Sequence, residues 1–507
     1  MRICIYGSSG VGKTTLSKIL SYVLYHELEV IHGDDFIRCD SEDWNSLETH
    51  LIDSNSFIFD HISSPTILKQ FKIIPDLAVG IRACTDNNDG FGESNLNYVK
   101  QTVVARSYSR QLIEVNTVRE AVENILQYLQ NIGKLPVPPE NFIVKIASHC
   151  NLSCSYCYMY QSLDDSVHSL PRSMSLDTAS QLGARLAEHF DSAKAVKVIR
   201  VILHGGEPLS LRPAEFKAIV SNIKVQLGGR DSVFSVQTNA TRITRRYLDI
   251  LDECGIHIGV SLDGVSAHSN RHRVYPSGAS AYERILRGIN MCMQYQFQNG
   301  SFGGVLCVVD PNADGKDTYR QLRALGLNSF DFLLRDEHHS FAPGGQTTEN
   351  SASKFLCDAF DEWLIDSTPC DVRLFNVIIS LSIGATYSID SFGLYPYNAL
   401  SVGVTGNWEL LDIFRICWTD AWKTQYSIQN HSVADVMASK ELSLLYQWQY
   451  DLSDSCLKCE HLTVCGGGYL PHRYHPTTGF RNPSSHCDTL FAFISHVQIR
   501  LKEFEVL

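Results

Sequence analysis

Between residues 141 and 334 the sequence alternates six apolar, strand-like runs with five segments of helical periodicity. The runs end near Ala147, Leu203, Gln237, Leu262, Val309 and Leu334, and the helical patterns cover about 175–190, 212–226, 242–254, 280–296 and 315–325. Strands separated by helices of this length pair in parallel through βαβ units. The pattern therefore predicts an α/β fold with a partial (β/α)6 TIM-type barrel. Functional residues are expected at the carboxyl ends of its strands.

The 507 residues are too many for one ordinary core, so the chain is expected to form several domains. A short, stiff, proline-rich segment at 133–139 follows an amphipathic segment at 117–131, and beyond about 345 the pattern becomes helical and then loop-rich. We therefore predict an α/β domain over 1–132, a linker over 133–140, the barrel over 141–345 and a C-terminal domain over 346–507.

Charge and composition restrict the partners. The formal net charge of −12 argues against a nucleic-acid partner, whose binding needs clustered Lys and Arg. No stretch reaches the apolar length of a membrane span, and the first residues do not resemble a signal peptide. Sixteen cysteines without an export signal indicate the reducing cytoplasm, where cysteines serve as metal ligands or buried thiols.

Three cysteines, Cys150, Cys154 and Cys157, follow the first strand-like run. Thiolates at this spacing can bind three irons of a four-iron cluster, and the fourth iron is then open to a ligand. A zinc knuckle, or three unconnected thiols, is the alternative that spacing alone permits.

Further polar residues follow the later strands, and all should meet at one end of the barrel. Gly205 and Gly206 would let a ligand approach the backbone closely, and Glu207 offers a carboxylate to an ammonium group. Asn239 and Ser261 supply amide and hydroxyl partners for a ribose or a carboxylate, and Tyr156 is suited to flank an adenine.

The run Cys-x3-Cys-x2-Cys followed by Gly-Gly-Glu-Pro resembles the motifs of radical S-adenosylmethionine (SAM) enzymes. The resemblance implies that Cys150, Cys154 and Cys157 hold a [4Fe-4S] cluster and that SAM binds its open iron. An external donor would supply the electron that cleaves the sulfonium. The implied SAM-binding residues are Tyr156, Gly205, Gly206, Glu207, Asn239 and Ser261.

A second set of cysteines near the end of the chain comprises Cys456, Cys459, Cys465 and Cys487. Four thiolates make a closed site, and the spacing suits zinc and an iron–sulfur cluster equally. The arrangement resembles the SPASM region of radical peptide-modifying enzymes, which implies an auxiliary [4Fe-4S] cluster. The comparable hairpin at 401–408 has no cysteine, and Tyr469 stands where a later ligand would be, so we predict one auxiliary cluster rather than two.

Several runs between about 141 and 495 resemble the FxsB-type cyclophane-forming maturases, above all the run from Cys465 to Tyr474. The resemblance implies a ribosomal precursor peptide as partner, and a carbon–carbon bond from an aromatic ring to the β-carbon of a residue two positions on. Thioether formation, epimerisation and sulfatase-type oxidation are the alternatives. Candidates for the catalytic base lie at or beyond predicted strand ends: Asp263 and Asp331 first, then Asp336, His338 and His339. A solvated or structural role is the alternative for each of them.

The amino-terminal segment from Gly7 to Thr14 matches the P-loop pattern, with a strand before it and a periodic helix after it. The backbone around Gly10 and Gly12 would cradle phosphates, Lys13 would reach the β/γ oxygens, and Thr14 with Asp60 would serve Mg²⁺. This predicts binding of ATP or GTP with Mg²⁺. Phosphoryl transfer and a docking or regulatory role are both open. A nucleotide-dependent kinase or switch with a peptide-recognising iron–sulfur half is a further alternative.

Overall fold

The computed structural model describes residues 137–504 apart from 163, 342–350, 386, 388, 411 and 418–421. Before residue 137 it describes 2–7, 16, 29–32, 57–60, 77–81, 112–115, 121 and 124–125. The chain divides into two compact units. The smaller comprises 1–136, 393–396 and 446–466, and the larger comprises 137–392, 397–445 and 467–507. The division after residue 136 falls inside the predicted linker, whereas none falls at 345.

The smaller unit contains a five-stranded parallel sheet in the order β2-β3-β1-β4-β5. Its strands are β1 (Arg2–Gly7), β2 (Glu29–His32), β3 (Phe57–Asp60), β4 (Leu77–Ile81) and β5 (Leu112–Val115). The central strand β1 ends at Gly7, where the predicted phosphate loop begins. Asp60 ends the neighbouring strand and pairs in register with Ile5. Gly10, Gly12, Lys13 and Thr14 lie outside the described residues.

The larger unit has the six strands and five intervening helices in the order that the sequence predicts. The strands pair in parallel with their sequence neighbours. They are β6 (Asn141–Ala147), β7 (Ile199–Gly205), β8 (Ser232–Thr238), β9 (Ile256–Ser261), β10 (Ser301–Val308) and β11 (Ser329–Leu333). The helices are α7 (Leu176–Ser192), α8 (Pro213–Leu227), α9 (Arg245–Glu253), α10 (Tyr282–Gln294) and α11 (Gly315–Ala324).

The sheet is wider than the periodicity of the sequence indicates, because distant segments extend it to ten strands. At one edge β12 (Asp371–Val372) pairs with β11. At the other edge β13 (Ala399–Val402) pairs in parallel with β6, and a hairpin continues it through β14 (Asn407–Glu409) and β15 (Lys423–Ser427). The predicted hairpin at 401–408 is therefore the β13–β14 turn, and it covers an edge of the sheet that would otherwise be exposed.

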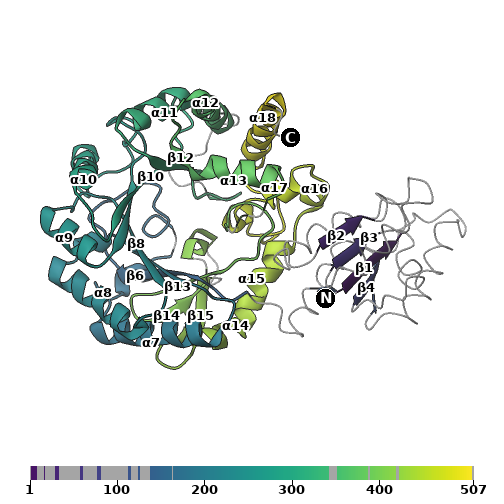
Figure 1. Ribbon diagram of the computed structural model, residues 1–507, viewed down its shortest axis with the longest axis horizontal. Helices are drawn as coiled ribbons and strands as arrows, with labels where there is room; N and C mark the ends of the chain where they lie inside the picture. Colours follow the sequence, from purple (N-terminus) through teal and green to yellow (C-terminus); the bar gives the residue numbers. More distant parts are fainter. Residues whose placement is uncertain are drawn as a thin grey trace, which may run out of the picture. The chain divides into compact units, whose positions relative to one another are not determined.

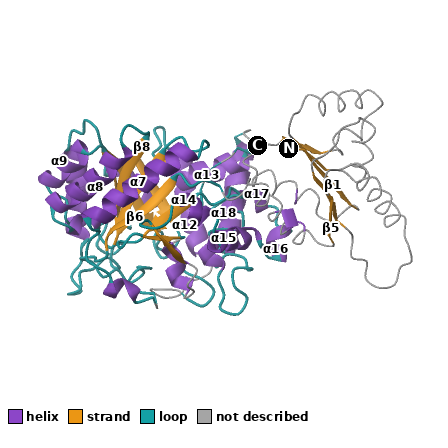
Figure 2. Cartoon of the chain, turned by 90° about the horizontal axis from the view of Figure 1, so that it is seen from below, coloured by secondary structure: helices purple, strands orange, loops and turns teal. Residues whose placement is uncertain are grey.

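Helices α7 to α11 lie on the outer side of the curved sheet (Figure 1), and the view from below shows α7, α8 and α9 beside its strands (Figure 2). Ser175 caps α7 by accepting a hydrogen bond from the Thr178 N–H. The remaining elements are η1 (Ser166–Ser169), η2 (Pro208–Ser210), α12 (Ser351–Ile365), α13 (Arg373–Ser382), η3 (Asp412–Cys417), α14 (Val433–Met437), α15 (Lys440–Tyr450), α16 (Asp454–Leu457), α17 (Leu462–Cys465), η5 (Leu470–Arg473) and α18 (Cys487–Glu503). Among the described helices, none is long and apolar enough to cross a membrane.

An aromatic cluster packs against β11, near the β12 edge of the sheet. Phe332 of β11 meets Phe355 of α12 and Phe375 of α13 edge-on or tilted, at ring-centroid distances of 5.3 and 5.8 Å. Phe375 in turn contacts Phe360 and Phe493. These rings bury large apolar areas and prefer such tilted contacts. The cluster therefore fixes β11, and with it the polar residues at its carboxyl end.

Candidate functional site

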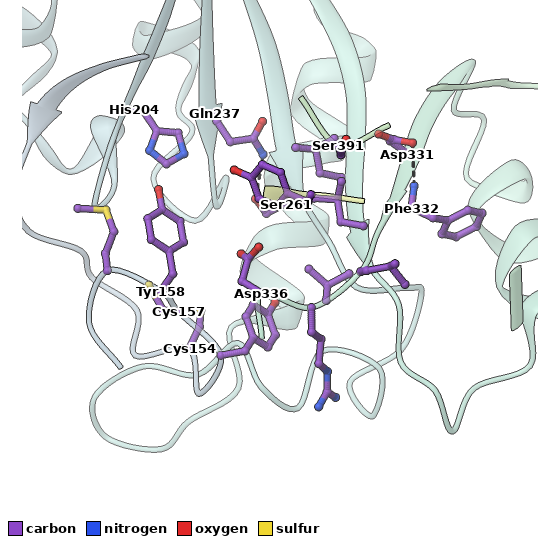
Figure 3. Close-up of a pocket in the computed structure, with 18 of the residues that line it drawn as sticks. Cys154, Cys157, Tyr158, His204, Gln237, Ser261, Asp331, Phe332, Asp336 and Ser391 are labelled. Atoms are coloured by element: carbon purple, nitrogen blue, oxygen red, sulfur yellow. Dashed lines mark hydrogen bonds between the residues drawn. The ribbon is translucent and has the colours of Figure 1, made fainter. Parts of the chain in front are cut away.

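A pocket of about 420 Å³ lies at the carboxyl ends of the six sequential strands, within the larger unit. Cys154 and Cys157 with Tyr158 and His204 line one side of it, and Asp331 and Ser391 line the other (Figure 3). Each of the strands β7 to β11 contributes at least one lining residue at its carboxyl end. The structure therefore brings the predicted strand-end residues to one pocket.

The loop that carries the three cysteines is fixed by backbone hydrogen bonds to the segment after β9. The Ser153 N–H donates to the Val274 carbonyl at 2.7 Å, and the Ser155 N–H donates to the His272 carbonyl at 3.2 Å. Cys150, Cys154 and Cys157 all line the pocket, and none of them forms a disulfide. The loop therefore presents three thiols from a fixed backbone.

Burial raises the pKa of all three thiols, that of Cys150 to about 12 and that of Cys157 to about 11. They are therefore neutral at pH 7 unless a nearby cation stabilises the thiolate, as bound iron does. Among the described residues, no three His, Cys, Asp or Glu side chains converge on a single metal ion. In a four-iron cluster each cysteine binds a different iron, so the absence of a single-ion site among these residues does not argue against a cluster on these thiols. Three thiols at the rim of one pocket fit the cysteine donors of such a cluster.

Gly205 and Gly206 are required by packing within the protein. A Cβ on Gly205, whose φ is +128°, would lie 2.0 Å from the Ala147 carbonyl oxygen. A Cβ on Gly206 would lie 2.4 Å from the carbonyl of His149, next to the first cysteine. The space beside these two glycines is therefore filled by the backbone that leads into the cysteine loop. The sequence instead predicts that a ligand approaches the glycines there.

Glu207 is 1% exposed and joins the ends of two strands. Its carboxylate accepts hydrogen bonds from the Leu209 N–H at 2.9 Å, the Thr238 hydroxyl at 2.6 Å and the Asn239 N–H at 2.7 Å. Burial raises its pKa, and these donors partly offset the effect. Glu207 also borders the pocket, and its carboxylate oxygens already accept these three hydrogen bonds from the protein.

Asn239 connects β8 to the cysteine loop. Its amide nitrogen donates to the Asn151 side chain at 3.1 Å and lies 3.8 Å from the Cys150 sulfur. Ser261 lines the pocket and accepts a hydrogen bond from Gln237 at 2.9 Å. Gln237, at a predicted strand end, and Thr238, which follows it, also border the pocket.

Asp263, expected to be a base, is a buried structural carboxylate. Arg273 donates to its two oxygens from Nε and Nη2, both at 2.9 Å, and the Tyr156 hydroxyl and the Val308 N–H also donate to it. Tyr156 lines the pocket as expected, with the Arg273 guanidinium 5.5 Å from its ring centre. Asp263 itself is not among the lining residues. It holds Tyr156 and Arg273 in place.

Asp331, the second expected base, borders the pocket but is held by α13. It accepts hydrogen bonds from Arg373 Nε at 2.7 Å and from the Leu374 N–H at 2.8 Å. Burial raises its pKa, while the Arg373 guanidinium acts in the opposite direction. The carboxylate therefore joins β11 to the start of α13.

Two other carboxylates border the pocket. Asp336 lies beside His472, whose Nε2 is 3.6 Å from its Oδ1. Asp390 makes no hydrogen bond or ion pair with another described side chain. Asp390 is exposed at the pocket; the protein packed around its carboxyl raises the pKa, and the Arg373 guanidinium acts in the opposite direction. Asp390 follows α13 in an irregular segment, so no sequence pattern placed it here.

The second set of cysteines lies on short elements of the C-terminal part. Cys456 is in α16 and Cys465 ends α17, both within the smaller unit, while Cys487 begins α18 in the larger unit. Cys459 lies between α16 and α17, and none of the four cysteines forms a disulfide. A single four-thiolate site therefore stays a prediction. Cys417 is buried, with its sulfur 3.7 Å from the Pro471 carbonyl oxygen, as expected of an isolated thiol.

Residues 144–322 match the sequence model of the radical SAM superfamily. A serine-type anaerobic sulfatase-maturating enzyme of Bacteroides thetaiotaomicron is 22% identical over 69% of this chain and 87% of its own length. A cysteine-type anaerobic sulfatase-maturating enzyme of Clostridium perfringens is 22% identical over 66% of this chain and 89% of its own.

Solved structures share the fold. The enzyme anSMEcpe with bound AdoMet superposes with a TM-score of 0.61 at 19% identity, covering 72% of this chain and 98% of that one. SuiB of Streptococcus suis bound to its precursor peptide SuiA gives a TM-score of 0.50 at 14% identity, covering 80% and 84%. Residues 144–322 therefore form a radical SAM domain, in a chain similar in sequence and fold to the anaerobic sulfatase-maturating enzymes.

Proposed function

We propose that the protein modifies a ribosomally made precursor peptide by radical chemistry, forming a carbon–carbon bond between an aromatic ring and a nearby β-carbon. The observation that carries the proposal is the pocket itself, which presents three thiols outside any disulfide together with two carboxylates, Asp336 and Asp390, that accept no hydrogen bond from a described side chain. The peptide substrate is supported by the similarity to the sulfatase-maturating enzymes and by SuiB, which was solved with a precursor peptide.

Cys150, Cys154 and Cys157 would hold a [4Fe-4S] cluster with an open iron for SAM, and this cofactor would supply the radical chemistry that removes a hydrogen atom from the substrate β-carbon. The resulting substrate radical adds to the aromatic ring. The adduct then loses one electron and one proton, so that aromaticity returns and the peptide has lost two hydrogens in total. The electron needs a one-electron acceptor of the iron–sulfur class, for which the set Cys456, Cys459, Cys465 and Cys487 is the candidate. An external donor supplies the first electron.

The proton needs a carboxylate that is not already held by an arginine. Arg273 occupies Asp263 and Arg373 occupies Asp331, so we assign the proton to Asp390, with Asp336 beside it. A raised pKa suits this role, because a base works best when its pKa is near the working pH.

Asp390→Asn is expected to slow product formation by about a hundredfold or more, because the amide cannot take the proton. Formation of 5′-deoxyadenosine should continue, since it precedes the proton transfer. In the wild type, product formation should fall as the pH drops through the raised pKa of Asp390, because the carboxyl becomes protonated. Parallel chromatography of 5′-deoxyadenosine and peptide checks this. Asp191→Asn, at an exposed pair with Arg230, is the matched control. Equal loss of both products would contradict the role.

Sulfatase-type oxidation of a serine or cysteine is the second candidate, favoured by the similarity to both classes of sulfatase-maturating enzyme. It begins with the same hydrogen abstraction but leaves an aldehyde. Tandem mass spectrometry of the co-encoded peptide after anaerobic reaction separates the two. A loss of two hydrogens with fragments joined across an aromatic residue supports the crosslink. An aldehyde that reacts with a hydrazide supports the oxidation, and an unchanged peptide rejects both.

We further propose that the smaller unit binds ATP or GTP with Mg²⁺. Support comes from the glycine-loop sequence, together with a parallel sheet whose central strand β1 ends at Gly7 beside Asp60.

Lys13→Ala is expected to weaken binding of ATP–Mg²⁺ by about a hundredfold, because a charged contact to phosphate is lost. Isothermal titration of the full chain measures it, and Lys100→Ala, elsewhere in the same segment, serves as control. An unchanged affinity would remove Lys13 from the nucleotide site. An unchanged rate of peptide modification in Lys13→Ala would show that the two activities are independent.

A further inference from the structure

Arg335 is a buried arginine at the pocket, two residues after β11 ends. It is 8% exposed, and its backbone carbonyl accepts a hydrogen bond from His486 Nε2 at 2.9 Å, which fixes its position. Its Nε is sealed from solvent and has no acceptor among the described residues. Within that part of the chain, its guanidinium forms neither a hydrogen bond nor an ion pair.

The two other arginines that line the pocket, Arg273 and Arg373, are paired, and so is Arg271. Arg271 pairs with Asp310, Arg273 with Asp263 and Arg373 with Asp331. Arg335 forms an ion pair with none of these three carboxylates, although its charge helps to lower the pKa of Asp310. A buried cation without an anionic partner is costly, because burial removes its hydration and nothing replaces it. A buried polar group left unsatisfied at a pocket calls for a partner from outside the protein.

A planar guanidinium fork matches the two oxygens of a carboxylate. We propose that Arg335 binds a carboxylate that enters the pocket with a ligand. Two ligands carry one: the peptide substrate, through an acidic residue close to the reacting position, and SAM, through its amino-acid part. The peptide is the favoured source because the expected SAM residues lie at or after the ends of β6 to β9, whereas Arg335 follows β11. This assignment of a substrate class rests on the proposed peptide modification.

Binding can be measured without turnover, so that it is separate from the proposed reaction. The probes are two pools of N-acetylated, C-amidated pentapeptides, randomised except for a central glutamate in one pool and a central glutamine in the other. Affinity selection with mass spectrometry on the cluster-reconstituted full chain should retain the glutamate pool about tenfold better. Arg335→Gln should lose this preference and Arg335→Lys should keep part of it. Arg320→Gln, at a pair with Glu362 away from the pocket, should behave as wild type.

A second arm measures the affinity for SAM by isothermal titration. Unchanged affinity in Arg335→Gln, with loss of the glutamate preference, assigns the carboxylate to the peptide. About tenfold weaker SAM binding with no glutamate preference in either protein assigns it to SAM. If neither the glutamate preference nor SAM affinity depends on Arg335, the carboxylate site is rejected. Retention of the glutamate pool without any peptide modification would instead reject the proposed function.

Thermal unfolding separates binding from a structural role. Because Arg335 has no partner in the free protein, Arg335→Gln should leave the Tm unchanged or raise it. Arg273→Gln removes the partner of buried Asp263 and should lower it. A fall in the Tm of Arg335→Gln as large as that of Arg273→Gln would show that Arg335 is structural, and would overturn the proposal.

Discussion

Cys154→Ser is expected to reduce formation of 5′-deoxyadenosine from SAM to background. Cys154 is the middle cysteine of a loop whose backbone is held at Ser153 and Ser155, so the neighbouring thiols cannot move to replace it. A cluster that loses one of three thiolate ligands is not retained with an open iron for SAM. Iron content and chromatography of the nucleoside, after anaerobic reconstitution and reduction with dithionite, measure the effect.

Cys357→Ser is the matched control, since this half-buried thiol lies on α12, outside the pocket. It should keep wild-type iron and 5′-deoxyadenosine. Wild-type formation of 5′-deoxyadenosine by Cys154→Ser would remove the three-cysteine loop from the reaction. A loss in both variants would point to damage to the fold.

Glu207→Ala is expected to lower the free energy of unfolding by about 3 kcal/mol, the second large effect. The substitution leaves three buried donors, Leu209 N–H, Thr238 hydroxyl and Asn239 N–H, without their acceptor. Each unsatisfied donor costs about 1–3 kcal/mol, and removal of a buried carboxylate returns part of that sum. SAM binding should weaken as well, because Asn239 and the cysteine loop lose their common support.

Urea unfolding followed by circular dichroism measures this change. Glu253→Ala, which removes an exposed partner of Lys217, should change the stability by less than about 1 kcal/mol. Glu207→Gln keeps one acceptor oxygen and should fall between the two. If Glu207→Ala unfolds at the wild-type urea concentration, Glu207 does not hold β7 and β8 together.

The peptide-modifying proposal explains why unpaired charges gather in one pocket. Asp336, Asp390 and Arg335 each lack a hydrogen-bonded partner of opposite charge among the described residues, although they border the same 420 Å³ space. Charged groups that gather at a pocket in this way are candidates for binding or catalysis. A substrate that brings a carboxylate to Arg335 and a proton to Asp390 would satisfy both groups at once.

Strand and helix positions followed from local periodicity. β6 ends at Ala147 as predicted, and the α8 and α11 bounds differ from the predicted ranges by one residue at each end at most. Repeated apolar spacing carries this information because each strand or helix buries one face against the sheet. Cys150, Cys154 and Cys157, with the strand-end residues from Gly205 to Ser261, were likewise readable from motif spacing, and the structure brings them to one pocket.

The sequence by itself therefore determined the order of strands and helices and the residues of the cysteine loop. Tertiary structure alone decided which charges are paired. Asp263 meets Arg273 ten residues away, and Asp331 meets Arg373 across 42 residues, so neither of the two leading candidate bases is free. Asp390 and Arg335 reach the same pocket from irregular segments with no motif. Pairing depends on how distant segments pack against one another, and periodicity records only the face that each segment buries.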